Sequence, residues 1–237
     1  MNKIIQMSGI FSDTVCMNNI FMKNDVKIWK KNVLIWAVCF FPLIFFFSCK
    51  SVPKESEIKE INLSRNILGN GILTKYELAG FFLENNSEMD ENYIVNFAKL
   101  YIEEAFDEGI NSDVAFAQMC LETGFLRFGG LVQPEFHNYC GLGAMDADHP
   151  GEMFETEQLG VRAHIQHLQA YATTADVSLN KELVDPRYGW VHKTKFVTDI
   201  FGLTGTWATD PNYGEKIDEI MSRMEIFAKE YAVSRSR

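Results

Sequence analysis

The sequence contains few cysteines, and no two of them have the spacing of a metal or redox motif. Five cysteines occur in 237 residues, and the lack of a C-x-x-C pair excludes a zinc ribbon and a thioredoxin-like site. Phosphate-binding loops, nucleophile elbows and Cys–His dyad signatures are absent as well. We therefore expect no cofactor.

A surplus of positive charge is also missing. The formal net charge is −10. Residues 1–48 contain five lysines and two aspartates, which leaves 17 basic and 30 acidic side chains, or a net charge of −13, in the remainder. Nucleic acids are bound through neutralisation of their phosphates, so we expect no nucleic-acid partner. A neutral or weakly charged polymer such as a glycan is compatible with this composition.

The sequence has one long hydrophobic run, at residues 32–48. A basic segment followed by an apolar run and a small residue is typical of a secretory signal. An uncleaved membrane anchor is the alternative, although the run is shorter than the ~20 apolar residues that span a bilayer and Pro42 interrupts it. The preceding lysines are Lys27, Lys30 and Lys31.

The end of this run resembles a bacterial lipoprotein signal. It reads F-F-S-C, with Ser48 before Cys49, and in such signals the cysteine becomes the lipidated first residue. We expect a protein that is anchored to a bacterial membrane through Cys49 and faces an extracytoplasmic space of the cell envelope. Met22 begins a conventional signal of this kind, so we predict that translation starts there and that the signal spans 22–48.

Composition divides the rest of the chain into a tether and one domain. Residues 49–70 begin with a polar stretch without periodicity, which predicts a flexible tether. We expect a domain at 71–233 and a tail at 234–237.

Helical signals recur through the domain. Thr74, Asp90 and Thr156 each precede an apolar pattern of helical period, and Asn111 or Ser112 precedes another. A further helix is predicted to start at Asp210–Pro211, with aspartate as the N-cap. Residues 129–151 have no sustained period, which predicts a long irregular segment, and segments of this length are usually functional. The fold class is therefore mainly α.

Glu122 stands out because it ends an apolar helical pattern, in the stretch A-F-A-Q-M-C-L-E-T-G-F-L-R-F-G-G of Ala115–Gly130. A carboxyl at a mostly buried helix end resists ionisation. It can then stay protonated and donate its proton to a leaving oxygen, as glycoside hydrolysis requires. The alternative is a helix-terminal glutamate that is bonded to nearby backbone.

Four segments in order resemble one known family. They are E-G-I-N-x-x-V-A-F-A-Q-M-C-L-E-T-G-F (Glu108–Phe125), H-N-Y-C-G-L-G-A (His137–Ala144), G-V-R-A-H-I-Q-H-L-Q-A-Y-A (Gly160–Ala172) and G-T-W-A-T-D-P-N-Y-G-E-K-I (Gly205–Ile217). Together they resemble the bacterial endo-β-N-acetylglucosaminidase family, the glucosaminidase domain of cell-wall autolysins. The resemblance implies a lysozyme-like single domain with a long irregular segment, or a short β-hairpin, beside an active-site cleft.

The resemblance also implies roles for single residues. Glu122 matches the family's catalytic general acid, and Tyr213 and Trp207 match aromatic residues near the cleft. Asn138 and Gly141 match the turn beside the cleft. The chain departs from the family pattern at Cys140, where phenylalanine is common, and at Gly143, where lysine is common.

Aromatic side chains are candidates for the glycan-binding surface, because sugars present apolar faces to aromatic rings. For each of them the alternative is packing in the core. The candidates are Phe125, Tyr139, Trp190, Trp207 and Tyr213.

The second catalytic group stays open. Most glycosidases use two carboxyl groups, and we rank Asp148 and Glu152 ahead of the neighbouring Asp146, with Glu155 also in this segment. Alternatively, the acetamido group of the substrate or Tyr213 takes this role.

Two further features bear on metals and disulfides. His164 and His167 have a spacing that can chelate zinc, but nothing nearby supplies a third ligand, so we expect no metal site. Cys120 and Cys140 either pair in an exported domain or remain buried thiols.

The resulting prediction is an endo-β-N-acetylglucosaminidase that cleaves the β-1,4 bond after N-acetylglucosamine in peptidoglycan glycan strands. One alternative is a muramidase or lytic transglycosylase of similar fold. The other is a non-catalytic lipoprotein that binds peptidoglycan.

Overall fold

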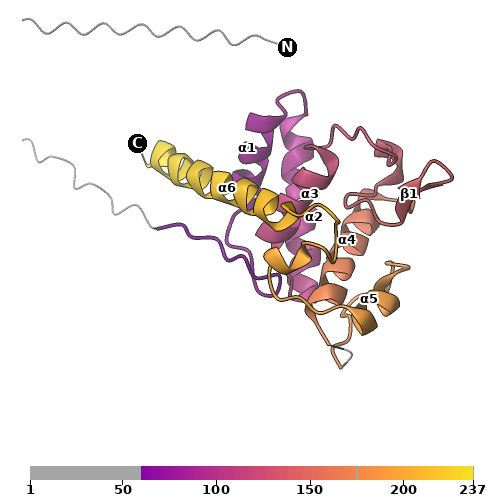
Figure 1. The fold of residues 1–237 in the computed structure, drawn as a ribbon. Helices are drawn as coiled ribbons and strands as arrows, with labels where there is room; N and C mark the ends of the chain where they lie inside the picture. The colour runs from indigo at the N-terminus through magenta and orange to yellow at the C-terminus, as the bar shows by residue number, and fades with distance from the viewer. Residues whose placement is uncertain (1–59, 175, 237) are drawn as a thin grey trace, which may run out of the picture. The chain divides into compact units, whose positions relative to one another are not determined.

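The computed structural model describes residues 60–174 and 176–236, and this part of the chain is mainly helical (Figure 1). The predicted signal, the start at Met22 and Cys49 lie outside the described residues. The described α-helices are α1 (Lys75–Asn85), α2 (Glu91–Glu108), α3 (Ser112–Thr123), α4 (Glu157–Ala172), α5 (Tyr188–Thr194) and α6 (Tyr213–Arg235). Short 3-10 helices occur at Pro134–Phe136 and Phe201–Leu203.

A small hairpin interrupts the helices. Strand β1 (Ala144–Asp146) pairs antiparallel with β2 (His149–Pro150), and the register shifts within β1. The predicted class, mainly α with a short hairpin in the irregular segment, is confirmed. No helix in the described part of the chain combines the length and hydropathy that a membrane crossing requires.

The predicted N-caps form as expected for the first four helices. Thr74 and Glu77 make both bonds of a capping box at α1. The side chains of Asp90 and Thr156 accept backbone N–H groups at α2 and α4. Asn111, rather than Ser112, is the N-cap of α3. Local chemistry therefore determines where these helices begin.

The predicted start of the last helix is corrected. Asp210 Oδ1 accepts the backbone N–H of Asn212 at 2.9 Å, so the aspartate closes a turn instead of capping a helix. Asn212 has φ −106° and ψ 18°, and α6 begins at Tyr213. The extra turn makes Tyr213 the first helical residue, and its side chain reaches α3.

The segment 49–70 was predicted as a tether, but the described residues at its end pack on the domain. Leu63 and Ile67 are buried. The backbone of Ile67 donates to Thr198 O at 3.0 Å and accepts from Asn111 N at 2.8 Å. The few apolar side chains of this polar stretch are thus buried between parts of the domain that are distant in sequence.

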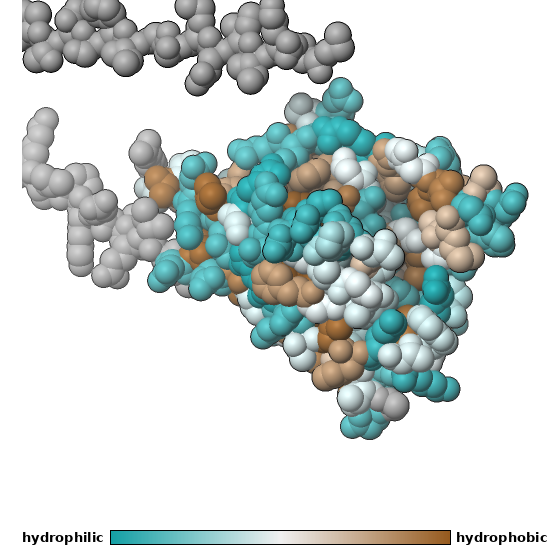
Figure 2. All heavy atoms as spheres, viewed as in Figure 1, coloured by the Kyte–Doolittle hydropathy of each residue, from teal (hydrophilic) through white to brown (hydrophobic). Residues whose placement is uncertain are grey.

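The core lies between the long helices, and α6 packs against both α1 and α3 (Figure 1). Among its largest fully buried side chains are Phe82, Tyr101, Phe116 and Ile165. Hydrophilic residues cover most of the face seen in Figure 2, and hydrophobic residues gather there only in small groups. The hairpin and α5 both lie at the end of the domain away from the C-terminus (Figure 1).

Candidate active site

The end of α3 presents Glu122 to a cavity. Gly124 caps the helix in the left-handed region, with φ 58°, and Phe125 and Leu126 continue it with φ 59° and 58°. The Thr123 hydroxyl accepts the N–H of Leu126 at 2.9 Å, which holds this tight reversal. Left-handed backbone in non-glycine residues is strained, and such strain often accompanies functional sites.

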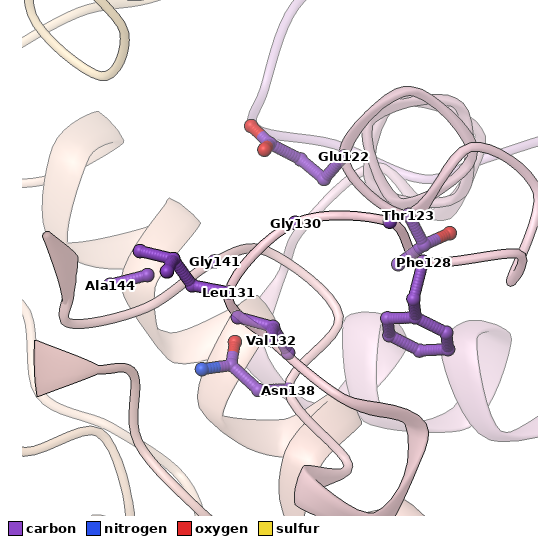
Figure 3. A pocket seen from close by; sticks show the side chains of 10 residues that line it. Glu122, Thr123, Phe128, Gly130, Leu131, Val132, Asn138, Gly141 and Ala144 are labelled. Atoms are coloured by element: carbon purple, nitrogen blue, oxygen red, sulfur yellow. The ribbon is translucent and has the colours of Figure 1, made fainter. Parts of the chain in front are cut away.

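The cavity beside Glu122 has a volume of about 190 Å³. Figure 3 shows Glu122 projecting from its helix on one side, with Asn138, Gly141 and Ala144 on the other. The segment with Gly130 also lines it. An open hollow with one carboxyl group at its edge is a suitable place for a glycosidic oxygen.

Two side chains hold Glu122 through one of its oxygens. Trp207 Nε1 donates to Oε1 at 3.0 Å, and the hydroxyl of Tyr213 donates to the same atom. The other oxygen, Oε2, faces Gly141, where even a Cβ atom would stand 3.8 Å away. Because Oε1 accepts two hydrogen bonds, the acidic proton belongs on Oε2, which is the oxygen on the cavity side.

Burial raises the pKa of Glu122 above its ordinary value, and the hydrogen bonds from Tyr213 and Trp207 offset only part of this effect. The side chain stays open to solvent on the cavity side, while protein atoms enclose the rest of the carboxyl. This arrangement favours the protonated acid and leaves its proton within reach of a substrate.

A chain of buried hydrogen bonds supports Tyr213 from behind. Gln118 Nε2 donates to the Tyr213 hydroxyl at 2.8 Å. Gln118 Oε1 lies 3.0 Å from His164 Nε2, and His164 Nδ1 lies 3.0 Å from the Tyr101 hydroxyl. The chain joins α2, α4, α3 and α6 and ends on Glu122.

The charge state of His164 fixes the direction of this chain. Burial, with a smaller effect of His167, lowers the pKa of His164 from 6.5 to about 3, so the ring is neutral at physiological pH. Since Gln118 Oε1 can only accept, His164 carries its proton on Nε2 and accepts from Tyr101 on Nδ1. Each member then donates toward Glu122, and the Tyr213 hydroxyl is left to donate to Oε1.

The turn opposite Glu122 is held by Asn138. Its Nδ2 donates to Leu142 O at 2.8 Å and to Glu152 O at 3.0 Å, and its Oδ1 accepts from Leu142 N at 2.9 Å. Asn138 is buried, so it shapes the cavity wall by fixing the loop. Gly141, with φ 67°, provides the left-handed residue that this turn needs.

The aromatic candidates separate into two groups. Tyr139 is buried, and its ring meets Phe97 edge-on at 4.8 Å. Phe125 packs against Phe82 at 5.6 Å between ring centroids. Tyr139 therefore packs in the core, whereas Phe125 is half-buried, and the assignment of Phe125 to the glycan surface stays a prediction. By contrast, 56% of Trp190 is exposed.

The two ranked carboxylates lie on the loop and hairpin. Asp148 is exposed at the hairpin tip. Asp146 accepts the backbone N–H groups of Asp148 and His149 and so stabilises this tip. Glu152 lies against Gly143, where an added Cβ would stand 3.1 Å from its Oε1. Neither ranked residue lines the cavity beside Glu122, and the second catalytic group remains a prediction.

The histidine pair and the two cysteines of the domain are buried parts of its interior. His167 Nδ1 pairs with Asp185 Oδ2 at 2.7 Å, and both ring nitrogens of His164 are already bonded. Within residues 60–174 and 176–236, no group of three metal-ligating side chains occurs. Cys120 and Cys140 are separate buried thiols.

Sequence reasoning missed the supports of the catalytic candidate. Gln118 precedes Glu122 by four residues and therefore shares its helix face, which is a signal that could have identified it. Tyr101 and His164 gave no such signal, because only packing joins their helices to α3.

Comparison with known proteins identifies the family of this domain. Residues 98–226, more than half of the chain, match the glucosaminidase family model, described as mannosyl-glycoprotein endo-beta-N-acetylglucosaminidase. The chain belongs to the glucosaminidase family. Its domain is accordingly that of a glycoside hydrolase, which acts on a glycan such as peptidoglycan.

A relative extends this likeness beyond the matched domain. An uncharacterized protein of Borreliella burgdorferi is 37% identical over 188 residues, which cover 76% of this chain and 91% of that protein. No solved structure matches the chain. Glu122, Trp207 and Tyr213 all fall within the matched region 98–226.

Proposed function

We propose that this glucosaminidase is an endo-β-N-acetylglucosaminidase that cleaves the β-1,4 bond after N-acetylglucosamine in peptidoglycan. The observation that carries the proposal is the carboxyl of Glu122, which is held on Oε1 by two donors and turns Oε2 toward an open cavity. Its raised pKa suits a general acid that protonates the leaving oxygen.

The lining of the cavity favours help from the substrate. Among the described residues that line the hollow beside Glu122, Glu122 is the single acidic one. The Tyr213 hydroxyl is committed to Glu122 and Gln118 in a buried position. We therefore propose that the acetamido group of the substrate stabilises the oxocarbenium-like state, a recognised exception to the two-carboxylate mechanism.

Glu122→Gln tests the assignment. The amide keeps an oxygen that accepts from Trp207 and Tyr213 but has no acidic proton. We expect the rate of release of reducing N-acetylglucosamine ends from purified sacculi to fall by about 10²–10⁴-fold, the usual contribution of a positioned acid. Retention of the wild-type rate would reject the role of Glu122.

Product analysis distinguishes the neighbouring activities. Mass spectrometry of the released fragments should show reducing N-acetylglucosamine ends. Anhydro-muramic ends would indicate a lytic transglycosylase, and reducing muramic ends a muramidase. Binding to sacculi without any fragments would indicate a non-catalytic binding protein.

The place of the enzyme is a separate proposal that rests on the sequence. We propose a cell-envelope lipoprotein whose lipid is attached to Cys49 and whose domain faces an extracytoplasmic space. Cys49→Ser should move the protein from the membrane fraction to the soluble fraction of the producing cell and abolish labelling with a radioactive fatty acid.

A further inference from the structure

A second cavity, of about 230 Å³, continues from the first. Both are lined by Gly141 and Ala144. Trp207 lines the second cavity with its ring, while its indole N–H binds Glu122. The walls come from the turn at 140–144, from α4 and from α5. The second cavity therefore offers a path for a glycan that places one bond at Glu122.

Two cations gather in the second cavity. The Cζ atom of Arg187 and the Nζ atom of Lys195 each lie 5.9 Å from the centroid of the Trp190 ring. Each group thus makes a cation–π contact with the same ring. The two cavities together form a candidate binding groove. Two positive charges therefore lie at one end of this groove in a protein that is acidic as a whole.

Neither cation is neutralised within the described part of the chain. The ion pairs found there do not include Arg187 or Lys195. Asp185 is close in sequence, but it is buried, pairs with His167, and accepts the backbone N–H of Arg187. No aspartate or glutamate lines the second cavity in this part of the structure. The two charges are therefore available to an anion.

The ring that both cations contact is itself exposed. Trp190 keeps 56% of its surface in solvent, and an exposed tryptophan in a polar groove is suited to the apolar face of a sugar. The site combines a platform for a sugar ring with two donors for a negatively charged substituent. Arginine and lysine both form strong charge-assisted hydrogen bonds with carboxylates.

We propose that the second cavity binds a carboxylate-bearing substituent of the glycan, with Arg187 and Lys195 as its ligands beside Trp190. This inference rests on the proposed function, because it places the glycan by the bond at Glu122. In peptidoglycan every second sugar carries a lactyl group, which ends in a carboxylate or in a peptide with carboxylates of its own. The enzyme thereby prefers such strands to neutral chitin.

Binding by the full chain in mild detergent tests the site without cleavage. The parent carries Glu122→Gln, and the probes are chitohexaose, peptide-free glycan strands with free lactyl carboxylates, and strands that keep their peptides. We expect the parent to bind at least one anionic probe about tenfold more tightly than chitohexaose, and this preference to weaken with added salt. The anionic probe with the greater preference identifies the lactyl or the peptide carboxylate as the ligand.

Single substitutions then assign the preference to the two cations. Arg187→Gln and Lys195→Gln should each reduce the ratio of neutral to anionic dissociation constants by about tenfold, as expected for a hydrogen bond to a charged group. Arg187→Lys should keep part of the preference. Lys193→Gln is the matched control, because Lys193 lies exposed on the same short helix and does not line the cavity.

The possible failures are distinguishable. Equal losses in Lys193→Gln and Lys195→Gln, or no preference in the parent, would overturn the subsite while leaving hydrolysis intact. A wild-type chain that prefers anionic strands but releases no reducing ends would overturn the proposed function. Circular dichroism of each variant checks that it has folded.

Discussion

At the scale of the residue, the chemistry of Glu122 depends on how its two oxygens differ. Oε1 accepts from Trp207 and Tyr213, and Oε2 faces the cavity. Both donors lower the pKa of the carboxyl, and burial raises it by more. Removing one of the two donors should therefore raise the pKa of Glu122 further. Replacing Glu122 by a neutral residue should remove the cost of ionising a buried carboxyl.

Tyr213→Phe tests the donor. The pKa of Glu122 should rise further, so the alkaline limb of the kcat/KM profile should move to higher pH. We expect the rate to fall about 10–100-fold, the worth of one hydrogen bond to a charged group. Tyr231→Phe, later in α6, is the control and should change neither the rate nor the alkaline limb of the profile. An alkaline limb that does not move in Tyr213→Phe would contradict the role of the hydroxyl.

Glu122→Gln also has a consequence for stability. A carboxyl whose folded pKa is raised above 4.5 binds more protons in the folded state than in the unfolded state. Its contribution to stability is therefore favourable below 4.5 and is lost as the pH rises through the folded pKa. The variant should melt at a higher temperature than wild type at pH 7, and the difference should vanish toward pH 4. A lower melting temperature at pH 7 would argue against the raised pKa.

At the scale of the element, the segment before α1 belongs to the fold. Ile67 is fully buried and hydrogen-bonds both Asn111 and Thr198, which are far apart in sequence. Arg65 adds ion pairs to Asp218 at 2.6 Å and Glu225 at 2.5 Å on α6. This segment therefore joins the start of α3 to α6, and a domain cut at residue 71 loses these contacts.

Ile67→Ala measures this contribution. Truncation of a fully buried isoleucine costs about 2–5 kcal/mol, and urea unfolding of the variant should show a loss of this size. Leu68→Ala is the control, since 43% of Leu68 is exposed. Equal small losses in both would mean that the segment behaves as a tether.

At the scale of the whole molecule, one buried hydrogen-bond chain connects four helices to the catalytic candidate. Tyr101, His164, Gln118 and Tyr213 come from α2, α4, α3 and α6. Because a neutral His164 sets the donor direction, the packing of the core and the orientation of Glu122 depend on the same proton. Acid conditions should therefore disturb both together.

Acid unfolding tests this dependence. The unfolded chain takes up a proton on His164 near pH 6.5, and the folded chain resists it down to about pH 3. Stability should thus decline as the pH falls through this range, by up to about 1.4 kcal/mol per pH unit. The difference in free energy of unfolding between wild type and His164→Leu should therefore shrink as the pH falls. His149→Asn, a variant at an exposed site, should lose stability over this range as wild type does. A constant difference would show that His164 is protonated when folded.

Sequence reasoning succeeded where the cause is local. The caps at Thr74, Asp90 and Thr156 depend on side chains within a few residues of the helix ends. It failed at α5, which has no side-chain cap at its first turn. It also failed at Asp210, which had two local bonding choices and took the turn.

By itself, the sequence determined the mainly helical class, the starts of the first four helices and the position of a single acidic residue at the end of α3. These features depend on hydrophobic periodicity and capping residues within short stretches of sequence, so they can be predicted from patterns along the chain. The tertiary structure alone decided that Trp207 and Tyr213 share one oxygen of Glu122, that His164 sets the direction of their support, and that Arg187 and Lys195 meet at Trp190. These partners lie on separate elements, and only packing brings their side chains within bonding distance.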